Sequence, residues 1–272
     1  MSIHPTAVIN QGAEIASDAE IGPYVVIEDH VKIAPRVKVM ASAYIGEWSE
    51  IGEDSEIHMG AVIGHLPQDL AFRKKITYLK IGKRNTIREY ATIHRGTQEG
   101  SSTLIGDDNF IMGFAHIGHN CMIGNNVVIA NAAALSGYVE VEDRAFISAS
   151  SLIHQFVRIG AIAMLSARTR LSKDVPPYML LSPAMGKDSI FGINVVGLRR
   201  AGFSQEVRSG IKIAYKIIYR SGLRLPEAIA ELEKSNPGPE VQHLIDFLKK
   251  PSKRGLSPHI SRTVASSAET AE

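Results

Sequence analysis

An aliphatic side chain recurs at every sixth residue from Ile3 to Leu171 of this 272-residue chain. Of the 29 positions in this count, 26 are Ile, Leu or Val, and the exceptions are Asp69, Lys75 and Glu99. A period of six fits neither an α-helix, which has 3.6 residues per turn, nor a half-buried strand, in which side chains alternate with a period of two. The pattern therefore indicates a repeating architecture.

Three short strands per coil of 18 residues account for this period, because one aliphatic side chain per strand can then point at the axis of a triangular prism. Glycine follows the aliphatic residue in nine of the hexads, and we expect it to permit the backbone angles and close approach of tight corners. Chance enrichment in isoleucine would not keep a single register over so many positions. The sequence thus predicts a parallel β-helix of hexapeptide type.

The charge and cysteine content narrow the function. Lys and Arg number 30 against 28 Asp and Glu, so a net charge of +2 gives no bulk support for binding nucleic acid. The single cysteine, Cys121, excludes an intramolecular disulfide framework and suits a reducing compartment. The first hexad begins at once, and no stretch of 18 apolar residues follows. We expect a cytoplasmic protein without an integral membrane segment.

Residues 1–190 are predicted to form the β-helix, with two segments that leave the prism. The hexad pattern is interrupted near residues 64–80, where Pro67 and a basic run follow Ile63, and again near residues 94–104. In a rigid solenoid, loops that leave the coils commonly carry binding residues.

Residues 191–256 are predicted to form a small helical domain that covers the open end of the prism. The hexads end at Leu171, and Pro176 and Pro177 cannot continue a β ladder. Ser204 is a candidate N-cap for a helix over 205–220, Pro226 opens a second helix, and Pro239 opens a third that ends near residue 249. Residues 257–272, rich in Ser, Thr and Ala, are predicted to be a disordered tail.

Four of the ten histidines are candidates for chemistry. His94, His116 and His154 are each one residue from an inward aliphatic position, so strand alternation turns them away from the axis. His119, two residues after Ile117, falls at a corner of the coil. Because flat prism faces pair in symmetric oligomers, an adjacent subunit could approach these residues.

Three chemistries could use such histidines. A zinc site needs three ligands at coordinating distance, and the two residues between His116 and His119 are a poor spacing for it, so we predict no metal site. A nucleophilic pair would need Cys121 to be accessible, although its side chain could equally fill the core. A single imidazole can also act as a general base toward a hydroxyl or amine.

Several segments carry a resemblance to a known family. They are Pro67–Leu70, Thr92–Thr97, Ala115–His119, Ile153–Phe156, Asp174–Tyr178 and Gly197–Ser204. In this order they closely resemble the UDP-N-acetylglucosamine acyltransferases of lipid A biosynthesis, and the likeness covers nearly the whole chain. The resemblance implies a left-handed parallel β-helix, an exception to the usual right-handed crossover, assembled as a homotrimer with sites between subunits.

The resemblance also implies the reaction and its residues. A 3-hydroxyacyl group would move from the thioester of acyl carrier protein to the 3-position of UDP-N-acetylglucosamine or its 3-amino analogue, with no cofactor. His119 would be the general base, and the backbone N–H of Gly137 would stabilise the oxyanion. The positions that match substrate-binding residues are Gln68, Asp69, His94, His116, Tyr138, His154, Gln155, Asn194 and Arg200.

The chain departs from the family pattern near these positions. Asn120 stands where an aspartate is common after the base, Tyr138 replaces an imidazole, and Val196 and Ala201 replace a frequent Glu and Arg. In this family, side chains on later coils set the acyl-chain length, and the stretch 164–168, with Ala167, is the candidate here. A paralogue that uses another acyl group or an amine acceptor, or a non-catalytic scaffold, remains an alternative to the lipid A acyltransferase.

Overall fold

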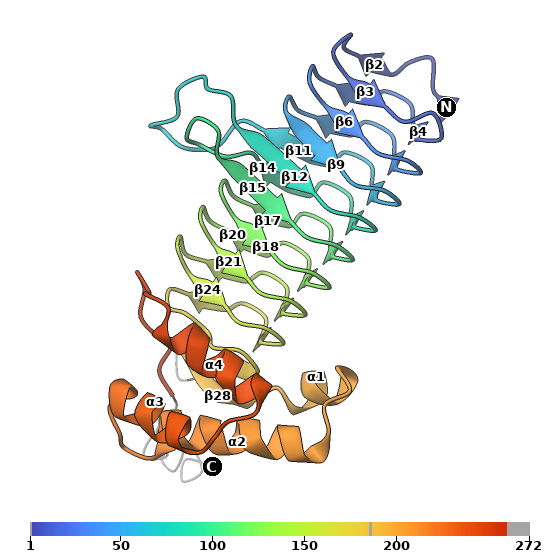
Figure 1. The fold of residues 1–272 in the computed structure, drawn as a ribbon. Coiled ribbons are helices and arrows are strands. Elements are labelled where there is room, and N and C mark those ends of the chain that lie inside the picture. The colour runs from blue at the N-terminus through green and yellow to red at the C-terminus, as the bar shows by residue number, and fades with distance from the viewer. Residues whose placement is uncertain (1, 185–186, 260–272) are drawn as a thin grey trace, which may run out of the picture.

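The computed structural model describes residues 2–184 and 187–259, which form a prism of stacked coils with helices at its C-terminal end (Figure 1). Each coil contributes one strand to each of three sheets, and equivalent residues of successive coils pair in parallel, as Ile3 does with Ile21. The predicted β-helix is confirmed.

The first sheet contains β1 (Ser2–Ile3), β4 (Glu20–Ile21), β7 (Lys38–Val39), β10 (Glu56–Ile57), β13 (Thr86–Ile87), β16 (Phe110–Ile111), β19 (Val128–Ile129), β22 (Phe146–Ile147), β25 (Met164–Leu165), β27 (Met179–Ala184) and β28 (Lys187–Ile193). The second contains β2 (Val8–Ile9), β5 (Val26–Ile27), β8 (Tyr44–Ile45), β11 (Val62–His65), β14 (Thr92–His94), β17 (His116–Ile117), β20 (Ala134–Leu135), β23 (Leu152–Ile153) and β26 (Arg170–Leu171). The third contains β3 (Glu14–Ile15), β6 (Lys32–Ile33), β9 (Ser49–Ile51), β12 (Tyr78–Ile81), β15 (Ser102–Ile105), β18 (Met122–Ile123), β21 (Glu140–Val141) and β24 (Arg158–Ile159).

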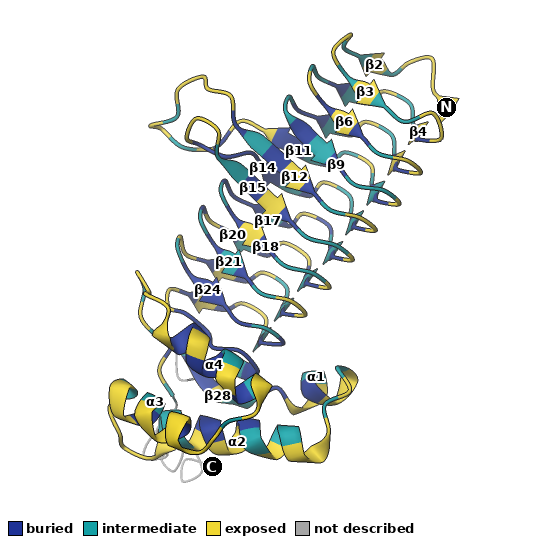
Figure 2. Cartoon of the chain, viewed as in Figure 1, coloured by how far each residue is buried: buried dark blue, intermediate teal, exposed yellow. Residues whose placement is uncertain are grey.

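The aliphatic residues of the hexads fill the axis of the prism. Ile27, Ile45, Ile63, Ile93 and Ile117 are fully buried, and the interior strand positions are dark in Figure 2. Complete burial of one such side chain contributes about 1.5–3 kcal/mol. The stacked column of these residues therefore holds consecutive coils together.

Two segments leave the prism without disturbing its register. Residues 66–77 connect β11 to β12, and residues 95–101 connect β14 to β15. Across them Ile63 pairs with Ile93, and Ile93 pairs with Ile117. Each segment adds a whole number of hexads, so the aliphatic residues beyond it still face the axis.

The corners contradict one expectation about glycine. The positive φ of each corner falls on the third residue after the inward aliphatic, as at Asn120 (57°) and Tyr138 (60°), rather than on the glycine that follows the aliphatic. Of the nine glycines, Gly64 alone has a positive φ. Gly52 is needed for close approach instead, because a Cβ there would lie 2.4 Å from the carbonyl oxygen of Gly82.

The C-terminal part adds elements that the sequence pattern did not indicate. Strands β27 and β28 form an antiparallel hairpin at the end of the first sheet, and helix α1 (Val195–Arg200) follows it. The three predicted helices are confirmed as α2 (Gln205–Arg220), α3 (Leu225–Lys234) and α4 (Pro239–Lys249), and the side chain of Ser204 caps α2. None of the helices within the described residues is long and apolar enough to cross a membrane.

The predicted disordered tail begins later than expected. Ser257 is buried and its N–H donates to the carbonyl of Asp174, while the ring of His259 lies 2.7 Å from the hydroxyl of Tyr215. These contacts attach residues 257–259 to the end of the prism and to α2. Residues 260–272 lie outside the described part of the chain.

Helix α4 packs against the last coils through polar contacts. Arg158 forms a buried ion pair with Asp174 and also donates to the carbonyl of Phe247 on α4. His243 and Glu142, half-exposed, lie 2.9 Å apart. These contacts couple the helical end to β21 and β24.

The contact between His243 and Glu142 predicts a pH-dependent stability. The hydrogen bond to Glu142 raises the pKa of His243 above its ordinary value of about 6.5. Its contribution is therefore fully present below pH 6.5 and is lost as the pH rises through the raised pKa. Because the pair is half-exposed, we expect at most about 1 kcal/mol.

The measurement is urea unfolding of the protein and of His243→Gln at about pH 6 and pH 8.5, on either side of that window. The wild-type protein should be the more stable at the lower pH, and the difference should shrink at the higher pH. An equal difference at both pH values would contradict the assignment.

Candidate functional site

Histidines from two successive coils meet on the second sheet. His94 ends β14 and His116 begins β17, and their ring centroids lie 4.9 Å apart. The hydroxyl of Thr92, which pairs with His116 across the two strands, lies 2.8 Å from its Nδ1. The coil spacing of the β-helix thus brings these imidazoles together.

Both rings are held neutral at pH 7. His94 is 4% exposed, and its burial, followed by the neighbouring histidines, lowers its pKa to about 4. Burial and then His119 lower the pKa of His116. The prediction that these side chains point away from the axis is compatible with the structure, but His94 is covered by its neighbours instead of solvated. Neutral imidazoles there can form hydrogen bonds to a ligand without adding charge.

His119 follows β17 at the corner and is 6% exposed. Its Nδ1 lies 3.1 Å from Oδ1 of Asn120, and the ring of Tyr138 meets it edge-on at a centroid distance of 5.2 Å. The expectation that a corner histidine would make little packing is therefore wrong. The next coil and the segment 95–101 cover it.

Gly137 lies against the imidazole of His119 from the next coil. A Cβ on Gly137 would lie 2.4 Å from Cε1 and 2.5 Å from Nε2 of that ring. Among the described residues, none accepts a hydrogen bond from the N–H of Gly137. The structure thus brings together the predicted base and the predicted oxyanion donor.

A polar chain connects the segment 95–101 to this corner. Asn120 Oδ1 lies 3.0 Å from the backbone nitrogen of Thr97 and 2.9 Å from its hydroxyl. The same hydroxyl lies 3.1 Å from the hydroxyl of Tyr138. Tyr138 is 18 residues after Asn120, so a count of one coil predicts their proximity, but no spacing pattern indicates Thr97, which lies outside the prism.

The remaining predicted residues on the β-helix lie around this cluster or on the first loop. His154 and Gln155 are exposed on the coil after Gly137, where the N–H of Phe156 donates to the Gly137 carbonyl. Gln68 is exposed on the segment 66–77. Asp69 is partly buried there, and its carboxylate accepts the N–H of Ala71 in a local turn.

Asn194 and Arg200 line a separate cavity of about 580 Å³ where α1 meets the last coils. No residue of the His119 cluster lines it. The amide of Asn194 caps α1 at Gly197 and donates to the carbonyl of Ile162, so it also holds the helix in place. The other lining residues are Asn126, Arg144, Phe146, Ile162, Met164, Val196, Gly197 and Ala201.

Arg144 is a lining residue that the sequence analysis did not identify. It follows Asn126 by 18 residues at the same corner, and it adds a second guanidinium to the cavity beside Arg200. The 18-residue count could have found it. The departures Val196 and Ala201 lie in this cavity as well, which places them away from His119 within one chain.

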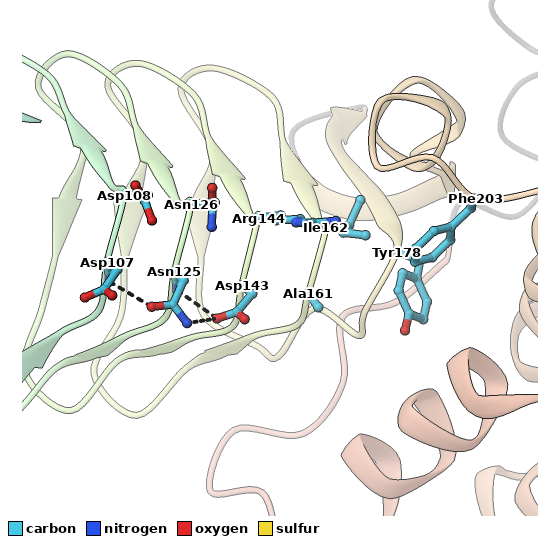
Figure 3. A pocket seen from close by; sticks show the side chains of 10 residues that line it. All are labelled: Asp107, Asp108, Asn125, Asn126, Asp143, Arg144, Ala161, Ile162, Tyr178 and Phe203. Atoms are coloured by element: carbon cyan, nitrogen blue, oxygen red, sulfur yellow. Dashed lines mark hydrogen bonds between the residues drawn. The ribbon is translucent and has the colours of Figure 1, made fainter. Parts of the chain in front are cut away.

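A neighbouring cavity of about 480 Å³ is lined by carboxylates and amides, and Figure 3 shows them in a row along one corner. Asn125 accepts the N–H of Asp107 and donates its own N–H to Asp143. These oxygens are occupied by corner N–H groups of adjacent coils. The row therefore stabilises the stacking of the coils, and we assign it no catalytic role.

Cys121 is not available as a nucleophile. Its side chain is fully buried, its thiol lies 3.1 Å from the carbonyl of Ser136, and burial raises the pKa of Cys121 to about 12. A thiol in this environment remains protonated at neutral pH. Among the described residues, no cluster of three or more His, Cys, Asp or Glu side chains is arranged to hold a metal ion.

Comparisons with known proteins agree with this geometry. Residues 30–65 and 102–137 match the bacterial transferase hexapeptide repeat, and residues 174–257 match domain 2 of UDP-N-acetylglucosamine O-acyltransferase. An acyl-[acyl-carrier-protein]–UDP-N-acetylglucosamine O-acyltransferase of Paraburkholderia phymatum is 48% identical over 93% of this chain and 98% of its own length.

Two solved structures are also similar. The UDP-N-acetylglucosamine acyltransferase of Bacteroides fragilis has a TM-score of 0.89 and 41% identity, covering 93% of this chain and 99% of its own. The enzyme of Francisella novicida has a TM-score of 0.92 and 35% identity, covering 99% of each chain. A left-handed parallel β-helix, a buried histidine beside a backbone N–H and this identity over nearly the whole length lead to one conclusion: the chain belongs to the acyl-[acyl-carrier-protein]–UDP-N-acetylglucosamine O-acyltransferase family.

Proposed function

We infer that this protein transfers a 3-hydroxyacyl group from acyl carrier protein to the 3-hydroxyl of UDP-N-acetylglucosamine, the first step of lipid A biosynthesis. The observation that carries this inference is the position of His119. Its Nδ1 contacts an amide oxygen, and its Nε2 faces Gly137. The relatives that share this fold over nearly its whole length carry the name of that activity.

The geometry supports direct transfer without a covalent enzyme intermediate. Nε2 of His119 removes the proton of the sugar 3-hydroxyl as the hydroxyl oxygen attacks the thioester carbonyl. The N–H of Gly137 donates to the resulting oxyanion. When the C–S bond breaks, the imidazolium returns the proton to the departing thiolate, which leaves an ester and the free thiol of the carrier protein. The neutral His94 and His116 bind and orient the polar groups of the substrate.

A direct assay tests this function. Purified protein is incubated with 3-hydroxyacyl carrier protein and either UDP-N-acetylglucosamine or its 3-amino analogue, and the products are followed by mass spectrometry. We expect an ester on the acetamido sugar. An amide formed only with the amino sugar would indicate the paralogous activity, and no product with any acyl chain would indicate a scaffold. A series of acyl chains would also test the role of Met164, which lines the cavity at α1, and of the exposed Ala167.

A homotrimer with shared sites is part of the same proposal, as is a cytoplasmic location beside the carrier protein. Within one chain, the His119 cluster and the cavity of Arg200 contain different residues, so a neighbouring subunit is needed to combine them. Exposed apolar side chains such as Tyr90 and Phe114, stacked at 5.3 Å, support association between prism faces.

Subunit mixing provides the measurement. Native mass spectrometry should give three times the 29.6 kDa chain mass. Co-expressed His119→Ala and Arg200→Ala chains, each inactive alone, should regain about a quarter of the wild-type activity, because a random assembly leaves that fraction of shared sites intact. A fully active monomer, or mixed assemblies without activity, would contradict the shared site.

A further inference from the structure

The polar chain from Thr97 to His119 has a direction that its geometry determines. The backbone N–H of Thr97 can only donate, so the atom of Asn120 that it contacts at 3.0 Å is the amide oxygen. That oxygen cannot donate, so Nδ1 of His119, 3.1 Å away, must carry a hydrogen. A neutral imidazole with hydrogen on Nδ1 has an unprotonated Nε2, which is the nitrogen that faces Gly137.

The hydroxyl groups complete the chain. The Thr97 hydroxyl has one hydrogen, and it donates this hydrogen to the Asn120 oxygen at 2.9 Å. The Tyr138 hydroxyl, 3.1 Å away, therefore donates to Thr97. Thr97 and Tyr138 hold the amide in the orientation that His119 requires, and the stacking of the Tyr138 ring on Phe156, at a centroid distance of 5.0 Å, fixes the far end.

We propose that Thr97 is a positioning residue for acyl transfer: together with Tyr138 it holds the Asn120 amide oxygen toward His119 and so keeps Nε2 as the unprotonated nitrogen. Asn120 is uncharged, so its attraction for the Nδ1 hydrogen depends on orientation. A rotated amide would present its NH₂ group to His119 and favour the opposite tautomer, in which Nε2 carries the hydrogen and cannot accept a proton.

The proposal rests on His119 as the general base of the proposed function, and it assigns a role to the segment 95–101. Thr97 lies in that segment, outside the coils, whereas Asn120 and Tyr138 lie on two successive coils. The segment thus contributes to the reaction by holding the base. Thr97 acts through Asn120, so its loss should change kcat and leave KM nearly unchanged.

Three substitutions test the relay kinetically. Thr97→Val removes the hydroxyl at nearly constant shape, and we expect kcat to fall about 3- to 10-fold with KM unchanged, the worth of one hydrogen bond. Thr97→Ser restores the hydroxyl and should restore kcat. Thr86→Val is the matched control, because Thr86 lies on β13 in another sheet and should tolerate the change. A kcat for Thr97→Val within about twofold of wild type would overturn the proposal.

The imidazole tautomer provides a readout that does not depend on turnover. In protein with ¹⁵N-labelled histidine, the His119 signals are identified by their loss in His119→Ala. We expect the Nδ1–H tautomer in the wild-type protein and a mixture in Thr97→Val. An Nε2–H tautomer in the wild type would overturn the relay. If the wild type shows the Nδ1–H tautomer but acylates no nucleotide sugar, the proposed function fails while the relay stands.

Discussion

The substitution His119→Ala should abolish turnover and leave the β-helix folded. Loss of a general base typically lowers the rate by about 10²–10⁴-fold, and no other group with a free basic nitrogen contacts Gly137 among the described residues. Because His119 is buried at a corner outside the aliphatic axis, its removal does not affect the stacked isoleucine column. Steady-state kinetics and circular dichroism of the purified variant provide the measurement.

His4→Ala is the matched control for this experiment. His4 is an exposed histidine of the first coil, where it contacts only Thr6, and its removal should leave turnover unchanged. A His119→Ala protein that kept more than about a tenth of the wild-type turnover would show that another group removes the proton.

Gly137→Ala should have the second largest effect, although it adds one methyl group and keeps the backbone N–H. The new Cβ would lie 2.4 Å from Cε1 of His119, a distance that no pair of carbon atoms tolerates, so the ring must turn away. A displacement of about 1 Å in a reacting group can lower the rate by about 10²-fold. We therefore expect a folded protein in which kcat falls by about two orders of magnitude.

Gly113→Ala is the control because it makes the same change at the same position of a hexad. There the nearest atom to the new Cβ is Oε1 of Glu89, at 3.1 Å on a flexible side chain, and His119 is not among the neighbours. Its activity should remain close to that of the wild type. If Gly137→Ala retained wild-type kcat, close contact between Gly137 and the imidazole would not be required for catalysis.

Much of the fold could be predicted from the sequence because a solenoid is built from local rules. Each inward Ile or Val is surrounded by its equivalents one coil away, so a count of six residues identifies the core and a count of 18 identifies the neighbours. The same count placed Gly137 beside His119. Helices α2 and α4 were predictable for a similar reason, since Ser204 and Pro239 are start signals that act within one turn.

Residues outside that repeat could not be placed in this way. Thr97 meets Tyr138 because the segment 95–101 folds back over the next coils, and no local pattern encodes that path. The hairpin of β27 and β28 and the short helix α1 likewise depend on the surface that the last coil offers them. Their contacts join residues that are distant in the sequence, so only the folded chain determines which groups meet.

The sequence by itself therefore determined the prism, its register and the column of corner residues that includes His119 and Gly137. Only the tertiary structure decided that His119 is buried, that Asn120 offers it an oxygen, and that Arg144 and Arg200 share a cavity. The physical reason is that hydrophobic periodicity specifies which side chains face the axis, whereas hydrogen-bond direction and burial outside the prism depend on the distances between atoms of different coils and loops.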